Sequence, residues 1–126
     1  MQGGEETILL VEDDSIVRAM MIVALRELGY NVLEASNGVV ALQLAEEYTG
    51  GDIHLLLSDI VMPLMNGIEL ARHFIALYPR TGILLMSGYV DEAEASASLP
   101  DSGIEFLRKP FSIPELAEKV RQVLDQ

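Results

Sequence analysis

The chain has 126 residues, the size of one compact domain, and we expect residues 5–125 to form it. The formal net charge of −12, from 20 acidic and 8 basic residues, would repel nucleic acid and anionic membranes, so we expect no direct binding to either. The lack of cysteine excludes disulfides and thiolate metal sites. No apolar run is long enough to cross a bilayer and the first residues are polar, so we expect a cytoplasmic protein without membrane insertion.

Five short apolar runs alternate with helical patterns along the chain. Residues 8–11 and 55–57 are apolar at every position, which is typical of strands covered on both faces. In chain order, we expect strands at residues 7–11, 31–35, 53–58, 82–86 and 104–107.

Apolar residues at intervals of three and four predict a helix after each of the first three strands. These three patterns end before Gly29, Gly50 and Pro79, residue types that stop helices. A further helix begins at the capping box of Ser112 and Glu115. The apolar stripe predicted for the first helix consists of Ile16, Val17, Met20, Ala24, Leu25 and Leu28.

The connection at residues 91–99 is rich in Ala and Ser and predicts only a short helix. Repeated strand-helix units imply a parallel sheet, and right-handed crossovers place helices on both of its faces. We therefore predict a doubly wound, three-layer α/β domain. In such sheets the functional crevice lies at the carboxyl ends of the strands.

Charged and hydroxyl side chains follow the predicted strands at this edge. In chain order they are Glu12, Asp13 and Asp14 after the first strand, Asp59 after the third, Ser87 after the fourth, and Lys109 with Pro110 after the fifth. Because parallel strands end at the same edge of a sheet, we expect these side chains to lie close together.

Clustered carboxylates repel one another unless a cation lies between them, and Mg²⁺ prefers a few carboxylates with water and phosphate oxygens. Glu12, Asp13 and Asp59 could hold such an ion. A carboxylate is also a nucleophile that can form an acyl phosphate, and Asp59 could attack phosphorus. Lys109 could then pair with one phosphoryl oxygen and Ser87 could donate a hydrogen bond to another.

Four segments resemble the receiver domains of two-component response regulators. They are Val-Glu-Asp-Asp at 11–14, Ser-Asp-Ile-Val-Met-Pro-Leu-Met-Asn-Gly at 58–67, Met-Ser-Gly-Tyr at 86–89, and Phe-Leu-Arg-Lys-Pro-Phe at 106–111. The resemblance spans residues 6–124 and implies a flavodoxin-like sheet with strand order 2-1-3-4-5 and five helices. The last two segments are most similar to receivers at the C-terminal end of hybrid sensor histidine kinases.

The resemblance implies a role for each acidic residue. Asp13 would bind Mg²⁺ directly and Glu12 largely through water, while Asp14 would fall outside the pair and precede the first helix. Asp59 would be the phosphoacceptor, and the backbone carbonyl of Val61 would be a further metal ligand.

The resemblance also implies a cis peptide bond between Lys109 and Pro110, and a switch formed by Ser87 and Phe106. On phosphorylation the hydroxyl would move toward the phosphoryl group and the ring would follow. This would remodel the surface made by the fourth helix, the fifth strand and the fifth helix.

Some residues depart from the commonest family pattern or suggest other sites. Glu12 stands where Asp is commoner in the family, and the resemblance places Val61 and Tyr89 at positions that, in receivers generally, modulate the lifetime of the acyl phosphate. His54 and His73 are expected to be ordinary surface histidines, the first at the opposite end of the sheet and the second on a helix.

Three alternatives compete with a phosphoacceptor. A phosphohydrolase with an Asp nucleophile would need a second Asp where Val61 stands, and a flavodoxin-like cofactor binder would have Glu12 and Asp13 repelling its phosphate. A receiver-like module that acts without phosphate is the third, and the complete set of site residues argues against it.

The resemblance implies that a histidine kinase or histidine phosphotransfer protein donates the phosphoryl group. The domain would catalyse its own phosphorylation and dephosphorylation, and if it belongs to a hybrid sensor, the parent chain would be a histidine kinase. No effector domain fits within 126 residues, so the output would pass to an unknown downstream protein or another part of a longer chain. A monomer and a phosphorylation-linked dimer both remain open.

Overall fold

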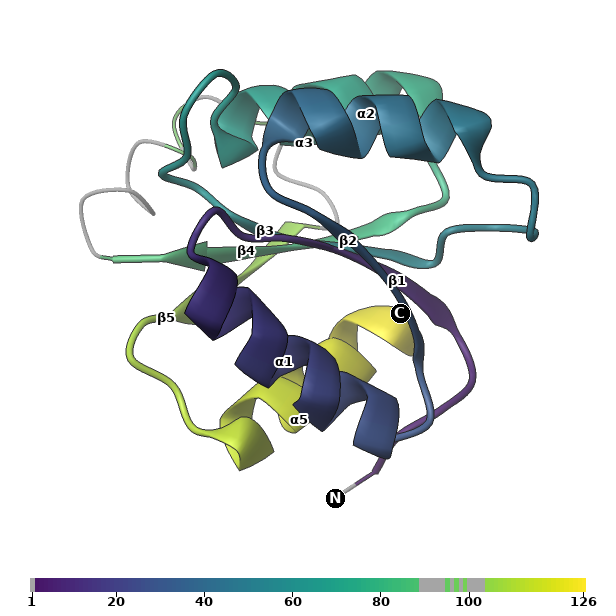
Figure 1. Cartoon of the computed structure of the whole chain (residues 1–126), viewed down its shortest axis with the longest axis vertical. Coiled ribbons are helices and arrows are strands. Elements are labelled where there is room, and N and C mark those ends of the chain that lie inside the picture. The colour runs from purple at the N-terminus through teal and green to yellow at the C-terminus, as the bar shows by residue number, and fades with distance from the viewer. Residues whose placement is uncertain (1, 89–94, 96, 98, 100–103) are drawn as a thin grey trace.

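The computed structural model describes residues 2–88, 95, 97, 99 and 104–126. Its five strands form one parallel sheet in the predicted order, β2-β1-β3-β4-β5 (Figure 1). The strands are β1 (Thr7–Val11), β2 (Asn31–Ala35), β3 (Leu55–Asp59), β4 (Gly82–Ser87) and β5 (Ile104–Arg108). The predicted doubly wound, flavodoxin-like fold is therefore confirmed.

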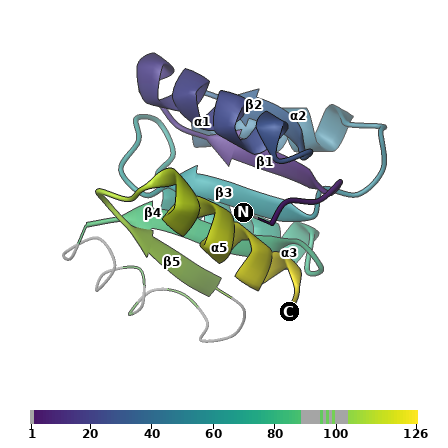
Figure 2. The ribbon, with the colours of Figure 1, turned by 90° about the horizontal axis from the view of Figure 1, so that it is seen from below.

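Helices cover both faces of the sheet. They are α1 (Ser15–Glu27), α2 (Gly38–Glu47), α3 (Gly67–Leu77) and α5 (Ile113–Leu124). Helices α2 and α3 lie on one face and α1 and α5 on the other, which gives three layers (Figures 1 and 2). Most of the helix predicted at residues 91–99, and Tyr89 before it, lie outside the described residues. Within the described ranges, no helix has the length and apolar character needed to cross a membrane.

The central strands explain the unbroken apolar runs in the sequence. Every residue of β1 and of β3 is buried, because each strand has a neighbour on either side and helices above and below. β3 begins two residues later than predicted, at Leu55, which pairs with Ile8 of β1. It also extends one residue further than predicted, because Asp59 pairs with Met86 of β4. This shift places Asp59 at the end of a buried strand.

The predicted apolar stripe of α1 is partly wrong. Ile16 and Met20 are 72% and 63% exposed, whereas Met21 and Ile22 are buried with Leu25 against the sheet. Apolar residues occur at helical spacing on two adjacent faces of this helix, so spacing alone could not select the face that packs. The result is an exposed apolar row on α1.

The predicted helix boundaries are set by local capping. Ser112 and Glu115 form the predicted capping box at the start of α5, and Asn66 and Glu69 form a second one at α3. Gly29 follows the C-cap of α1 with φ of 98°, a left-handed conformation that favours glycine. The predicted stop at Gly29 is therefore confirmed.

Candidate functional site

Three carboxylates from two strand ends lie together at the carboxyl edge of the sheet. Glu12 and Asp13 follow β1 and Asp59 ends β3, and one oxygen from each lies within 4.8 Å of the others. Glu12 is 1% exposed and Asp59 9%, while Asp13 lies at the surface. The site is therefore an acidic pocket in which two carboxylates are buried and one is exposed.

Lys109 brings a positive charge into this pocket from the loop after β5. Its Nζ lies 3.0 Å from Asp59 Oδ2 and 3.5 Å from Glu12 Oε1. Its backbone N–H donates to the carbonyl oxygen of Ser87 at 2.9 Å, and the peptide bond from Lys109 to Pro110 is cis. Backbone contacts with the end of β4 thus place the ammonium over the acidic group.

The electrostatics of the pocket favour a bound cation. Burial, aided by the neighbouring Asp59 charge, raises the pKa of Glu12 to about 7. Burial would lower the pKa of Lys109, but its hydrogen bond to Asp59 and the charges of Asp59 and Glu12 outweigh this, so the pKa is raised. Three carboxylates face one ammonium, which leaves an excess of negative charge.

Ser87 ends β4 with its hydroxyl buried. The side chain is 1% exposed, and within the described residues its Oγ is the one buried side-chain polar atom without a hydrogen-bond partner. Buried hydroxyls are normally paired, so Ser87 retains the capacity to donate a hydrogen bond at this end of β4. Ser58, the neighbouring buried serine on β3, donates to the carbonyl oxygen of Asp59 at 2.8 Å.

Phe106 lies on the same face of the sheet as Ser87. The register pairs Phe106 with Leu85, and Ser87 is two residues further along β4, so both side chains point to one face. Phe106 is partly buried against the cluster formed with α2 and α3. Val61 lies in the loop after β3 with its side chain exposed.

Arg18 and Asp14 make hydrogen bonds that hold the acidic loop, and the sequence predicted neither set of contacts. Arg18 of α1 donates from Nη1 to the carbonyl oxygen of Glu12 at 2.7 Å. Asp14 caps α1, accepting from the N–H groups of Ile16 and Val17, as its predicted place before the helix allows. The sequence did not indicate the contact of Arg18, because a backbone carbonyl acceptor leaves no pattern in the residue types.

Gly67 lets the start of α3 lie against the pocket floor. Its N–H donates to the carbonyl oxygen of Ile60 at 2.8 Å, and a Cβ atom there would overlap the carbonyl oxygen of Asp59. A side chain at this position would push the strand end and the helix apart. Glycine therefore maintains the position of Asp59.

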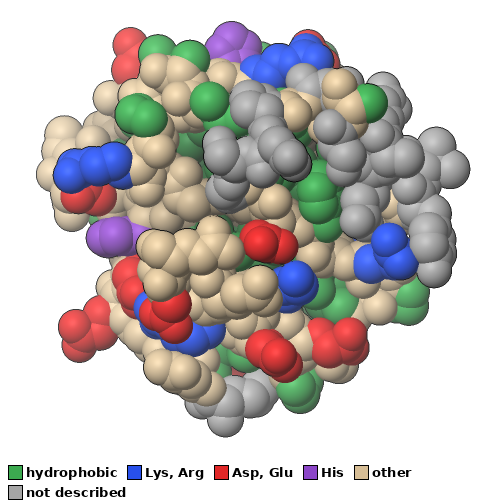
Figure 3. Space-filling view, turned by 180° about the vertical axis from the view of Figure 1, so that it is seen from behind, with side chains coloured by type: hydrophobic (Ala, Val, Ile, Leu, Met, Phe, Trp, Pro, Cys, Tyr) green, Lys and Arg blue, Asp and Glu red, His purple; other side chains and the backbone are tan. Residues whose placement is uncertain are grey.

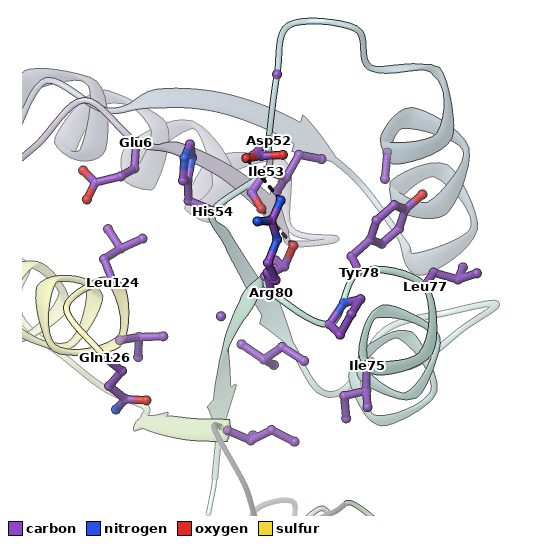
Figure 4. A pocket seen from close by; sticks show the side chains of 18 of the residues that line it. Glu6, Asp52, Ile53, His54, Ile75, Leu77, Tyr78, Arg80, Leu124 and Gln126 are labelled. Atoms are coloured by element: carbon purple, nitrogen blue, oxygen red, sulfur yellow. Dashed lines mark hydrogen bonds and ion pairs between the residues drawn. The ribbon is translucent and has the colours of Figure 1, made fainter.

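A groove lies at the opposite edge of the sheet. It has a volume of about 1020 Å³, and its walls include His54, Asp52 and Arg80 (Figure 4). His54 is exposed and its Nδ1 accepts from the N–H of Thr7 at 3.0 Å, and His73 is an exposed residue of α3. The groove contains none of the predicted site residues.

Several basic side chains outside the pocket lie beside acidic ones. On the face shown in Figure 3, most blue groups have a red group nearby, and the blue groups are not gathered in one patch. The ion pairs of Lys119 with Glu105 and of Arg121 with Glu6 are examples of this arrangement.

Together, the fold and the pocket define a class of doubly wound α/β domain with an acidic site and one lysine at the carboxyl edge of the sheet. Comparison with protein families matches residues 8–121 to the response regulator receiver domain. The chain belongs to this family, whose members work in two-component systems with histidine kinases or phosphotransfer proteins and downstream effectors.

Individual relatives occur both inside longer proteins and as short proteins. The chain is 41% identical over 124 residues to the sensor kinase CckA of Brucella abortus, covering 98% of this chain but 13% of CckA. It is 36% identical over 117 residues to the response regulator receiver protein CpdR of the same organism, covering 93% of this chain and 95% of CpdR.

The fold agrees with the solved structure of a receiver domain that belongs to a longer protein. The crystal structure of the receiver domain from the hybrid histidine kinase CckA superposes with a TM-score of 0.78 at 39% identity. The superposition covers 94% of this chain and 98% of that one. The predicted similarity to receivers of hybrid sensor kinases is therefore confirmed.

Proposed function

We propose that Asp59 accepts a phosphoryl group from the phosphohistidine of a histidine kinase or phosphotransfer protein. The observation that carries this proposal is the position of Asp59 between an ammonium, 3.0 Å away on Lys109, and two further carboxylates. The Asp59 carboxylate oxygen attacks phosphorus, an O–P bond forms, and the N–P bond breaks with its electron pair returning to the donor imidazole.

The residues present fit a bound Mg²⁺. The ligands would be Glu12, Asp13 and Asp59, all hard oxygen donors within 4.8 Å of one another, with the carbonyl of Val61. The ion, when bound, neutralises carboxylate charge and orients phosphoryl oxygens. Lys109 offsets charge on one phosphoryl oxygen, and the unpaired hydroxyl of Ser87 donates to another. Attack of water on phosphorus later releases phosphate and restores the Asp59 carboxylate.

Output then follows from Ser87 and Phe106. When the Ser87 hydroxyl moves to a phosphoryl oxygen, it leaves space on the face of the sheet that Phe106 shares. Phe106 is partly buried on β5, which is an edge strand of the sheet. A shift of its ring would therefore change the surface at this edge, which supports the use of this surface by an unknown downstream protein or by a second copy of the chain.

The exposed apolar row of α1 supports docking of the phosphoryl donor. Ile16, Met20 and Val23 are spaced so that they lie along one side of the helix, which starts two residues after Asp13. An apolar surface next to a charged reaction site suits a protein donor better than a small molecule. We propose that a helix of the donor packs on this row and presents its phosphohistidine to Asp59.

Residues 5–125 are proposed as the complete receiver unit, acting in the cytoplasm where ATP-dependent kinases supply phosphohistidine. The relation to CckA supports a place within a hybrid kinase, and the relation to CpdR supports a separate regulator. A phosphohydrolase remains disfavoured because Val61 replaces the second Asp that it needs, and a receiver-like module without phosphate remains the alternative.

Beryllofluoride, a tetrahedral mimic of an aspartyl phosphate, tests the proposal without hydrolysis. ¹⁹F NMR should show a bound species with Mg²⁺ that is lost without Mg²⁺ and in Asp59→Asn. A bound species that persists in Asp59→Asn would contradict the assignment of Asp59. No bound species under any condition would favour the module that acts without phosphate.

A further inference from the structure

Arg18 contacts the backbone of the acidic loop. Its Nη1 donates to the carbonyl oxygen of Glu12 at 2.7 Å, and its Nε lies 3.2 Å from Glu34 Oε1 on β2. The arginine side chain is 18% exposed, so these contacts hold a largely buried side chain. One charged side chain thus connects α1, β2 and the peptide bond that precedes Asp13.

The contact fixes the orientation of that peptide bond. The N–H of Glu12 donates to the carbonyl oxygen of Ala35 at 3.2 Å, so Glu12 is held by β2 on one side and by Arg18 on the other. Because the peptide unit from Glu12 to Asp13 is planar, fixing its oxygen sets the direction in which the Asp13 backbone continues.

Asp13 depends on this backbone more than the other two carboxylates do. Glu12 and Asp59 are buried and contact Lys109, whereas Asp13 lies at the surface, where packing of the core does not hold it. Capping by Asp14 fixes the chain immediately after it. Asp13 therefore lies between two anchored points, one of which is the arginine contact.

We propose that Arg18 is a positioning residue for Mg²⁺ binding, acting through the Glu12 carbonyl to hold Asp13 toward the pocket. This inference rests on the proposed Mg²⁺ site and adds a residue outside the ligand set. Partners of this kind orient metal ligands, and their loss weakens metal binding.

The chain offers a matched control on the same helix. Arg26 of α1 donates from Nη2 to the carbonyl oxygen of Val32 on β2 at 3.2 Å. This contact also joins α1 to the backbone by an arginine, but it lies near the far end of the helix from the acidic loop. Arg18→Met and Arg26→Met both keep an unbranched apolar stem and remove the donor.

The experiment is an NMR titration of each full-length variant with Mg²⁺, beside urea unfolding in EDTA. Arg18→Met should raise the Mg²⁺ Kd by roughly tenfold, the lower end for loss of an orienting partner. Arg26→Met should keep the parent Kd, although both variants lose stability. In metal-free protein, the Asp13 amide resonance should shift or broaden in Arg18→Met and stay in place in Arg26→Met.

Equal Kd values in parent and Arg18→Met, or equal losses in both arginine variants, would overturn the inference and leave the Mg²⁺ site intact. No saturable Mg²⁺ binding by the parent would overturn the proposed site and the inference with it. Glu34→Thr serves if Arg18→Met does not fold. It should raise the Kd about two- to threefold, as expected for loss of a partly exposed ion pair, and an unchanged Kd would then count against Arg18.

Discussion

The Lys109 ammonium lies 3.0 Å from the Asp59 carboxylate although 50 residues separate them in the chain. Both residues stand at strand ends, Asp59 on β3 and Lys109 just after β5, with β4 between these strands. The same ammonium reaches Glu12 at 3.5 Å, so it connects the ends of three strands. In the proposed reaction it would exchange the Asp59 oxygen for a phosphoryl oxygen, which makes it a sensor of the state of Asp59.

Mg²⁺ should stabilise the protein through Asp13. A ligand that binds only the folded state raises the free energy of unfolding, by about 2.7 kcal/mol at a hundred times its Kd. Thermal unfolding with increasing MgCl₂ should therefore show a rising midpoint in the parent and none in Asp13→Ala. Asn37→Ala is the control, because it removes the cap of α2, and with it about 1 kcal/mol of stability, while leaving the Mg²⁺ response unchanged. A full Mg²⁺ response in Asp13→Ala would show that Asp13 is no ligand.

Ser87→Ala should keep or increase the stability of the unphosphorylated protein while weakening beryllofluoride binding. The unpaired buried hydroxyl costs free energy in this state, and its removal relieves up to about 1 kcal/mol. Ser58→Ala should instead lower the free energy of unfolding by about 1 kcal/mol, because it loses the hydrogen bond to Asp59. Urea unfolding measures both effects, and a loss of stability in Ser87→Ala would mean that its hydroxyl is already paired.

Glu6→Gln should destabilise the protein at neutral pH but not in acid. The hydrogen bonds from Arg121 lower the pKa of Glu6 below its usual 4.5. An acid whose folded-state pKa is lowered contributes stability above its unfolded pKa, and this contribution is lost as the pH falls through the folded value. Unfolding free energies should therefore differ by about 1 kcal/mol at pH 7 and converge below pH 4.5. Glu5→Gln removes the neighbouring charge and should keep the parent free energy of unfolding at pH 7.

Met20→Glu should slow phosphorylation by a protein donor but not by acetyl phosphate. A charge in the exposed apolar row of α1 would have to be desolvated against the donor, at a cost of about 1–3 kcal/mol or roughly 5–150-fold in rate. Val39→Glu is the control, since Val39 is an exposed apolar residue of α2 on the other face of the sheet. If the phosphorylated donor transfers its phosphoryl group to both variants at equal rates, α1 is not the docking surface.

The sequence was sufficient for the fold and for the edge of the sheet that carries the site. Buried apolar runs that alternate with helical patterns are compatible with few sheet topologies. Each of these topologies places Glu12, Asp59 and Lys109 at one edge of the sheet. It was not sufficient for details that depend on packing in three dimensions. Two faces of α1 satisfy helical spacing, and the contact of Arg18 with a carbonyl oxygen leaves no pattern in the residue types.

Phosphorylation of Asp59 is the central claim, and intact mass tests it most directly. The protein and Asp59→Asn are each incubated with acetyl phosphate, with and without Mg²⁺. Their intact masses are then measured immediately by mass spectrometry. The account predicts a gain of one phosphoryl group that requires Mg²⁺ and is absent in Asp59→Asn. A gain of the same mass in Asp59→Asn, or one that is independent of Mg²⁺, would contradict it. If no gain occurs and beryllofluoride does not bind, the domain acts without phosphate.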